Sequence, residues 1–285
     1  GRFGGEDGIP GALHRPSLSD ANRYPLKISD FMVFDIDPKK APVHMAWSSS
    51  PELVDSTLPN VGFTGDRWYR PMKIADEWAE YTGTVMTVDP SGRGNDETGV
   101  AVVKILHGML FVVEATGLAG GYSEETMNTI GKLAWKHSVN QMLIEDNFGD
   151  GMFTQLLKPW LHKWHNVSIE ETKHSTQKEA RMLDTLEPIL NQHRLIIDRQ
   201  LIQDDFEKTE TPAYQLMVQL TRLTRDRGAV KHDDRLEALS MAVQYWVNQM
   251  DRDVDQAQRD HRVPNRRRGP ACPAVGGHQE RSLGA

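Results

Sequence analysis

Val85-Met86-Thr87-Val88-Asp89-Pro90-Ser91-Gly92 joins the pattern of a buried strand to the pattern of a turn. The apolar and β-branched residues favour a strand, and the Asp-Pro-Ser-Gly sequence that follows is typical of a tight turn. This arrangement predicts that the strand ends with the carboxylate of Asp89 at the edge of a sheet. Taken alone, the pattern is common in turns that have no catalytic role.

Two more acidic points stand at the ends of expected elements. Glu145 closes the apolar run Met142-Leu143-Ile144, and Asp234 lies in His232-Asp233-Asp234-Arg235-Leu236-Glu237-Ala238-Leu239, which predicts the start of a helix. Acids at a strand end or in the first turn of a helix often serve only solvation or the helix dipole. Three of them at three element ends favour one shared site, because hard oxygen ligands suit divalent metal ions and paired metals suit phosphodiester cleavage.

The rest of the pattern predicts an α/β fold with strands running in both directions. The expected strands are residues 85–89, 99–106, 109–114, 141–145, 167–169 and 195–197. The expected helices are residues 123–137, 151–164, 177–192, 213–223 and 233–250, with Pro159 bending or splitting the second. Residues 1–80 are expected to be a linker or the trailing end of an upstream region, 81–250 the folded domain, and 251–285 a flexible basic tail.

Composition narrows the class of protein. The 285 residues carry a net charge of -7, which is weak evidence against a simple basic nucleic-acid binder, although local patches matter more than the sum. The single cysteine, Cys272, excludes a disulfide framework within one chain and favours a reducing compartment. No apolar run approaches the roughly 20 residues that a membrane helix needs, so no membrane span is expected.

These motifs resemble a known family. The patterns Val-Asp-Pro-Ser-Gly, Ile-Glu-Asp-Asn and His-Asp-Asp-Arg-Leu-Glu-Ala-Leu, in this order of elements, resemble the RNase H-like nuclease domain of phage terminase large subunits, especially the DNA maturase B type of short-tailed phages. The resemblance covers about residues 80–250. It implies an RNase H-like (RuvC-like) mixed sheet flanked by helices, and a metal-dependent endonuclease that cuts concatemeric double-stranded DNA during genome packaging.

The resemblance also implies roles for individual residues. Asp89, Glu145 and Asp234 would be the catalytic carboxylates that hold two Mg²⁺ or Mn²⁺ ions, with Asp89 bridging both. Asp233 and Glu237 remain alternative or additional metal ligands, and Glu237 stands where many members carry Asp. No Gly-x-x-x-x-Gly-Lys-Ser/Thr loop occurs in the chain, so ATP would be used only by a domain upstream of it.

Several cations are expected to bind the DNA backbone, each of which could equally be a solvated surface charge. They are Lys173, Lys178, Arg181, Arg93, Arg225 and Lys231. His232 could ligate metal or orient a carboxylate, although a histidine at a helix start is the simpler interpretation. The tryptophans are expected in the core: Trp135, Trp160, Trp164 and Trp246.

The resemblance implies partners and a location as well. These are double-stranded DNA, a small terminase subunit, the portal of the procapsid and an upstream ATPase domain, in the cytoplasm of the infected host cell. Two alternatives stay open. The same fold and acid pattern serve Holliday-junction resolvases and transposases, and a degenerate nuclease fold could act only as a DNA clamp or portal-docking module.

Overall fold

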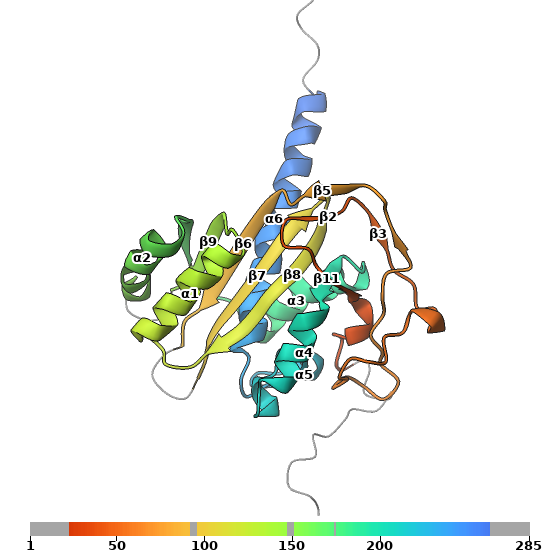
Figure 1. Ribbon diagram of the computed structural model, residues 1–285, viewed down its shortest axis with the longest axis horizontal. Helices are drawn as coiled ribbons and strands as arrows, with labels where there is room; N and C mark the ends of the chain where they lie inside the picture. The colour runs from red at the N-terminus through yellow and green to blue at the C-terminus, as the bar shows by residue number, and fades with distance from the viewer. Residues whose placement is uncertain (1–22, 92–95, 147–150, 174, 263–285) are drawn as a thin grey trace, which may run out of the picture. The chain divides into compact units, whose positions relative to one another are not determined.

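The computed structural model describes residues 23–91, 96–146, 151–173 and 175–262. The chain divides into two compact units, Gly1–Val247 and Asn248–Ala285. The first unit contains a seven-stranded sheet with helices on both faces (Figure 1). None of the described helices is long and apolar enough to cross a membrane.

The sheet has the order β1-β11-β8-β7-β6-β9-β10. Its strands are β1 (Met32–Phe34), β6 (Gly83–Asp89), β7 (Thr98–Leu106), β8 (Met109–Leu118), β9 (Gln141–Glu145), β10 (Ser168–Thr172) and β11 (Leu195–Asp198). Only β7 runs antiparallel to its neighbours, and every other pair in this sheet is parallel. The expectation of a mixed α/β sheet is therefore confirmed. Because β6 and β9 are parallel, their carboxyl ends lie at the same edge.

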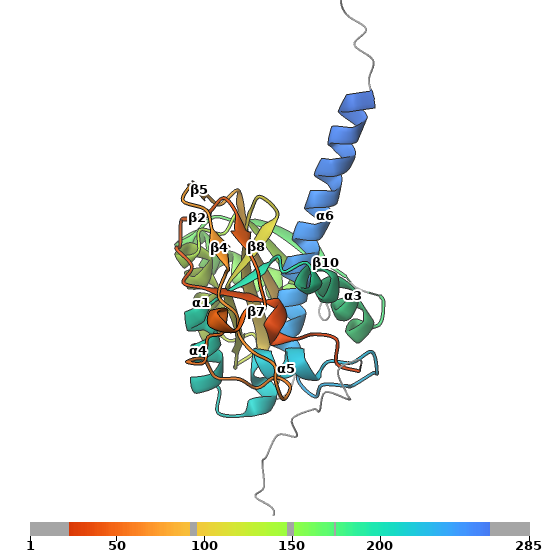
Figure 2. The same ribbon diagram turned by 90° about the vertical axis from the view of Figure 1, so that its right-hand side faces the viewer.

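Helices form a layer on each side of this sheet. α1 (Glu124–Lys136) and α2 (Met152–Trp164) share a core cluster on one side (Figure 1), and α3 (Lys178–Asn191) and the beginning of α6 (Asp234–Arg262) lie on the side opposite α1 (Figure 2). α4 (Arg199–Glu207) and α5 (Leu216–Arg222) follow β11. Two small antiparallel sheets pair β2 (Lys40–Pro42) with β5 (Trp78–Glu80) and β3 (Met45–Ala46) with β4 (Lys73–Ile74).

The central strands are apolar on both faces, as strands covered by helices must be. All nine residues of β7 are buried. One core cluster joins β6, β7 and β9 to α1 and α2, and includes Met86, Val102, Ile130, Met142 and Leu157. Ser123 caps α1 by accepting a hydrogen bond from the backbone N–H of Thr126, as its sequence predicted.

Parts of the secondary structure differ from the expectation. β1 pairs with β11, so at least this segment before residue 80 belongs to the sheet rather than to a linker. α2 runs through Pro159 without a break, and α6 continues to Arg262, because residues 251–262 hold neither proline nor glycine. α4 was not expected, because its nine residues are mostly polar and give no apolar stripe long enough to recognise.

Candidate active site

The three expected carboxylate positions meet at one edge of the sheet. Val88 of β6 pairs with Ile144 of β9, so the next residues, Asp89 and Glu145, leave adjacent strands at the same level. The beginning of α6 packs across β6, where the hydroxyl of Thr87 donates a hydrogen bond of 2.5 Å to the carbonyl oxygen of Ala238. This contact joins residues that are 151 positions apart in the sequence.

Two glycines permit this close approach. Gly99 on β7 is paired with Asp89, and a Cβ at Gly99 would overlap the backbone carbonyl of Asp234. On its other side, Gly99 pairs with Gly117 of β8. A Cβ at Gly117 would meet the ends of the Glu97 and Arg235 side chains rather than backbone. Backbone cannot withdraw from an added methyl group as a side chain can, so Gly99 is the stricter requirement for placing the start of α6.

The first turn of α6 is also held from the side of α5. The side chain of Gln219 accepts a hydrogen bond of 3.0 Å from the backbone N–H of Leu236. The guanidinium of Arg235 pairs with Glu97 at 2.9 Å and with Asp205 at 3.2 Å. These partners fix the rotation of the helix, and with it the directions of its acids.

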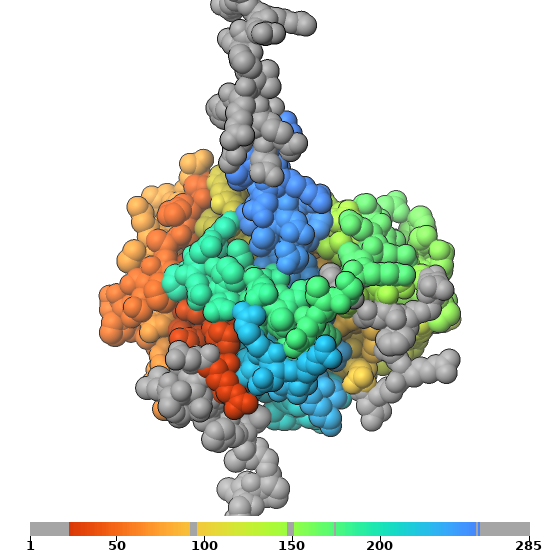
Figure 3. Space-filling view, turned by 180° about the vertical axis from the view of Figure 1, so that it is seen from behind, coloured from red at the N-terminus to blue at the C-terminus, as the bar shows by residue number. Residues whose placement is uncertain are grey.

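Five acids form what we call the carboxylate cluster: Asp89, Glu145, Asp233, Asp234 and Glu237. Lys178, from the first turn of α3, reaches into it. Its Nζ lies 2.8 Å from Oδ1 of Asp233 and 3.5 Å from Oδ2 of Asp89. α3 and α6 lie side by side on this face (Figure 3), which brings the lysine to the acids.

Arg181, one helical turn further along α3, supplies the second cation. Its guanidinium pairs with Glu237 and lies 3.9 Å from Glu145. Lys178 and Arg181 were predicted to lie beside the acids and to bind the DNA backbone. The structure places both within the carboxylate cluster, where they offset part of its negative charge.

Burial of like charges perturbs the acids. Asp89 is 4 % exposed, and burial, with added repulsion from neighbouring carboxylates, raises its pKa well above the ordinary value despite Lys178. Burial likewise raises the pKa of Asp234 to about 6 and that of Glu237 to about 7. Two cations therefore do not fully offset five acids, and further positive charge would be favourable here.

Some oxygens of the cluster are buried without a hydrogen-bond partner among the described residues. They are Oε2 of Glu145, Oδ2 of Asp234 and Oε2 of Glu237. A buried carboxylate oxygen left unpaired costs free energy unless a cation or a donor meets it. The donor chemistry thus fits a divalent metal with hard oxygen ligands, such as Mg²⁺ or Mn²⁺.

A second potential ligand group adjoins the cluster. One ligand atom each from Asp96, His232 and Asp234 all lie within 4.8 Å of one another. The His232 ring stacks on Tyr214 with the centroids 4.0 Å apart, which fixes the plane of the imidazole. His232 thus lies close enough to Asp234 to orient it or to share a cation with it, and Asp234 belongs to both groups.

Three of the other predicted DNA-binding cations lie at the surface. Lys173 pairs with Asp146 at 2.9 Å, next to Glu145, and Arg225 pairs with Asp184 at 2.8 Å. Lys231 is exposed just before the start of α6, and Arg93 lies outside the described residues.

The tryptophans divide between core and surface. Trp246 is 8 % exposed, as predicted, but Trp135 is 60 % exposed on α1. The prediction for Trp135 was wrong, because Met127, Ile130 and Ala134 complete the buried face of α1 and Trp135 lies at the margin of that face, beside Trp164.

Comparison with known proteins identifies the domain. The family described as "Terminase Bacteriophage T7, Ribonuclease H-like domain" matches residues 88–195, which include Asp89 and Glu145. Residues 88–195 belong to the terminase ribonuclease H-like family. The chain is also 39 % identical over 245 residues to the terminase large subunit of Enterobacteria phage T3, covering 84 % of this chain. It spans only 42 % of the length of that relative.

Solved terminase nucleases are similar in structure. A human cytomegalovirus terminase nuclease domain, soaked with manganese and bound to an inhibitor, matches with a TM-score of 0.44 and 14 % identity, over 57 % of this chain and 82 % of the other. The large terminase nuclease of the thermophilic phage G20c matches with a TM-score of 0.41 and 10 % identity, over 78 % of this chain and 98 % of the other.

Proposed function

We propose that this terminase domain is a metal-dependent endonuclease that cuts concatemeric double-stranded phage DNA during genome packaging. The observation that carries the proposal is the meeting of Asp89, Glu145 and the start of α6 at one sheet edge, where Glu145 and two acids of α6 each have a buried carboxylate oxygen without a hydrogen-bond partner among the described residues. A cluster of unneutralised acids is costly to a fold that binds DNA phosphates, unless it holds cations that the reaction needs.

Mg²⁺ or Mn²⁺ would be held by Asp89, Glu145 and the acids that open α6. Two bound ions would supply a more acidic water as nucleophile and stabilise the leaving oxygen of the phosphodiester. The protein's own part is to place the carboxylates beforehand. Strand pairing fixes Asp89 and Glu145, and the close approach at Gly99 fixes the start of α6.

We propose Asp234 as the third catalytic carboxylate. Asp233 forms an ion pair with Lys178 and Glu237 forms one with Arg181, whereas Asp234 forms no ion pair among the described residues, and its Oδ2 is buried. Asp233 and Glu237 then serve as additional ligands or hold the two cations in place.

DNA would approach along the rim of the cluster. The side chain of Lys178 is about one-third exposed, so its ammonium group can contact a DNA phosphate in addition to Asp89 and Asp233. Lys173, Arg225 and Lys231 are the surface cations proposed to contact the backbone, where such contacts position the duplex without reading its sequence.

The wider setting is proposed from the T3 relative, of which this chain matches less than half. An ATPase domain would precede the nuclease in the full protein and would be the only part to use ATP. A small terminase subunit and the portal of the procapsid would be its partners, in the cytoplasm of the infected host cell.

The test is cleavage of plasmid and linear duplex DNA by the 285-residue chain with Mg²⁺ or Mn²⁺. We expect Asp89→Asn to reduce cleavage by about a thousandfold or more, and the control Glu170→Gln, at an exposed site on β10, to cut normally. Full activity of Asp89→Asn would contradict the proposal. Strong preference for a four-way junction over linear duplex would instead indicate a resolvase.

A further inference from the structure

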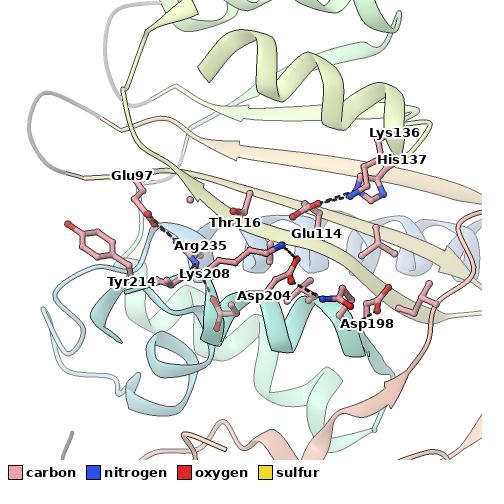
Figure 4. A pocket seen from close by; sticks show the side chains of 18 of the residues that line it. Glu97, Glu114, Thr116, Lys136, His137, Asp198, Asp204, Lys208, Tyr214 and Arg235 are labelled. Atoms are coloured by element: carbon pink, nitrogen blue, oxygen red, sulfur yellow. Dashed lines mark hydrogen bonds and ion pairs between the residues drawn. The ribbon is translucent and has the colours of Figure 1, made fainter. Parts of the chain in front are cut away.

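A pocket of about 750 Å³ lies away from the carboxylate cluster, on the other side of Arg235. It is bounded by β8 and α4, with Glu97 and Arg235 at one end and Lys136 and His137 at the other (Figure 4). Nothing in the nuclease proposal uses this pocket.

One wall of the pocket is a strand edge. β11 pairs with β8 only from Leu110 to Val112, and the chain then turns at Asp198 into α4. Among the described residues, no strand pairs with that side of β8 beyond Val112. Residues 113–117 of β8 line the pocket, so their edge faces a space rather than a neighbouring strand. A free strand edge of this kind is a template for a further strand.

The walls of the pocket are rich in carboxylates. Its acids are Glu97, Glu114, Asp198, Asp204, Asp205 and Glu210. They outnumber the three cations Lys136, Lys208 and Arg235, each of which pairs with an acid of the pocket. Asp198 and Glu210 form no ion pair within 4 Å among the described residues, so the pocket keeps unpaired negative charge. That charge would repel DNA and attract a cationic ligand.

The strand edge and the charge together define the ligand. We propose that the pocket binds an extended segment of another protein that carries lysine or arginine at alternate positions. The segment would pair with residues 113–117 of β8 in the place that β11 leaves. Its main chain would supply hydrogen bonds, and every second side chain would meet the acids. Binding needs neither metal nor DNA, so it stands independently of the nuclease proposal.

The probe is a fluorescein-labelled peptide amide, Val-Lys-Val-Lys-Val-Lys, titrated against the full chain in EDTA and followed by fluorescence anisotropy. We expect saturable binding with a Kd below ~1 mM. A version with alternate backbone nitrogens methylated keeps the charge but cannot pair as a strand, and we expect it not to bind. A Val-Glu version is expected not to bind either, because its charge is repelled.

The location is tested by removing the two unpaired carboxylates. The double variant Asp198→Asn/Glu210→Gln should weaken binding about tenfold. Asparagine can still cap α4 as Asp198 does, so this variant should fold. The matched control is Glu170→Gln/Glu171→Gln on β10 at the opposite side of the sheet, which should bind like the parent.

Three results would overturn the proposal: no saturable binding up to ~1 mM peptide, equal binding of the methylated peptide, or an unchanged Kd in Asp198→Asn/Glu210→Gln. Asp89→Asn should bind the peptide like the parent, so loss of nuclease activity leaves this result unaffected.

Discussion

The start of α6 separates two acid-rich regions that are neutralised in different ways. In the pocket, hydrogen bonds from His137 and the charge of Lys136 outweigh burial and lower the pKa of Glu114. In the carboxylate cluster, burial and mutual repulsion win, and the pKa of Asp89 is raised. Glu114 is thus neutralised by cations of the protein itself, whereas the acids of the carboxylate cluster exceed their cations and need positive charge from solution.

Gly99 and Gly117, which pair across β7 and β8, allow each region to be disturbed separately. Gly99 lies against the carboxylate cluster side of α6, and Gly117 lies against Glu97 and Arg235 on the pocket side. Gly99→Ala should reduce metal-dependent cleavage by about a hundredfold, because the new methyl group would displace the backbone of Asp234 and with it a carboxylate of the site. Gly117→Ala, whose methyl group meets the far end of the Glu97 side chain rather than backbone, should cost less. Cleavage rates at saturating Mn²⁺ would compare them. Equal losses would show that the backbone contact at Gly99 is not what positions α6.

Removing Arg235 from the pocket side and Lys178 from the carboxylate cluster should affect stability differently, because only the loss of Lys178 can be offset by a metal ion. Arg235→Met leaves Glu97 and the buried Asp205 without their partner, and should lower the free energy of unfolding by about 3–5 kcal/mol whether or not metal is present. Lys178→Met should lower the melting temperature in EDTA, and Mn²⁺ should restore it by offsetting the same acids. Thermal melts of both variants and the parent with and without Mn²⁺ would decide, and the account would be contradicted if Mn²⁺ removed the difference in melting temperature between Arg235→Met and the parent.

Stability without metal should depend on pH. Burial raises the pKa of Glu237 to about 7, above the 4.5 of an unperturbed glutamate. The folded state therefore holds this proton more tightly than the unfolded state, and the stability it gives is complete below about pH 4.5 and lost as pH rises through about 7. The loss should be on the order of a few kcal/mol.

Denaturant unfolding in EDTA between pH 5 and 8 would measure this effect, and Glu237→Gln should flatten the profile. Glu170→Gln, with its side chain in solvent, should keep the profile of the parent. A free energy of unfolding that rises across this range would mean that burial does not raise the pKa values of the cluster acids.

The sequence predicted the elements of the site better than its contacts. β6, β9 and the start of α6 were expected within one or two residues, because apolar runs and acidic helix starts are local signals. Contacts between distant residues were not predictable. Lys178 and Arg181 were expected beside the acids, but the sequence did not identify their individual partners, Asp233 and Glu237, which lie 55 and 56 residues further along the chain.

Gly99 and Arg235 were missed for a similar reason. A glycine in an apolar strand gives a weak signal for close backbone approach, but nothing in the sequence says which backbone approaches. Arg235 stands beside the acids in the sequence, yet its side chain leaves them for Glu97 and Asp205 on the pocket side. Arg235 and Asp234 are neighbours in the chain, and the rotation of α6 about its axis decides that one faces the pocket and the other faces the carboxylate cluster.

The most direct test of the account is Mn²⁺ binding by isothermal titration calorimetry. The parent chain and Glu170→Gln should bind Mn²⁺ saturably and alike, whereas Asp89→Asn and Glu145→Gln should each weaken binding by at least about tenfold, because each removes a charged oxygen ligand. If the double variant Asp89→Asn/Glu145→Gln bound Mn²⁺ as tightly as the parent, the carboxylate cluster would not be the metal site.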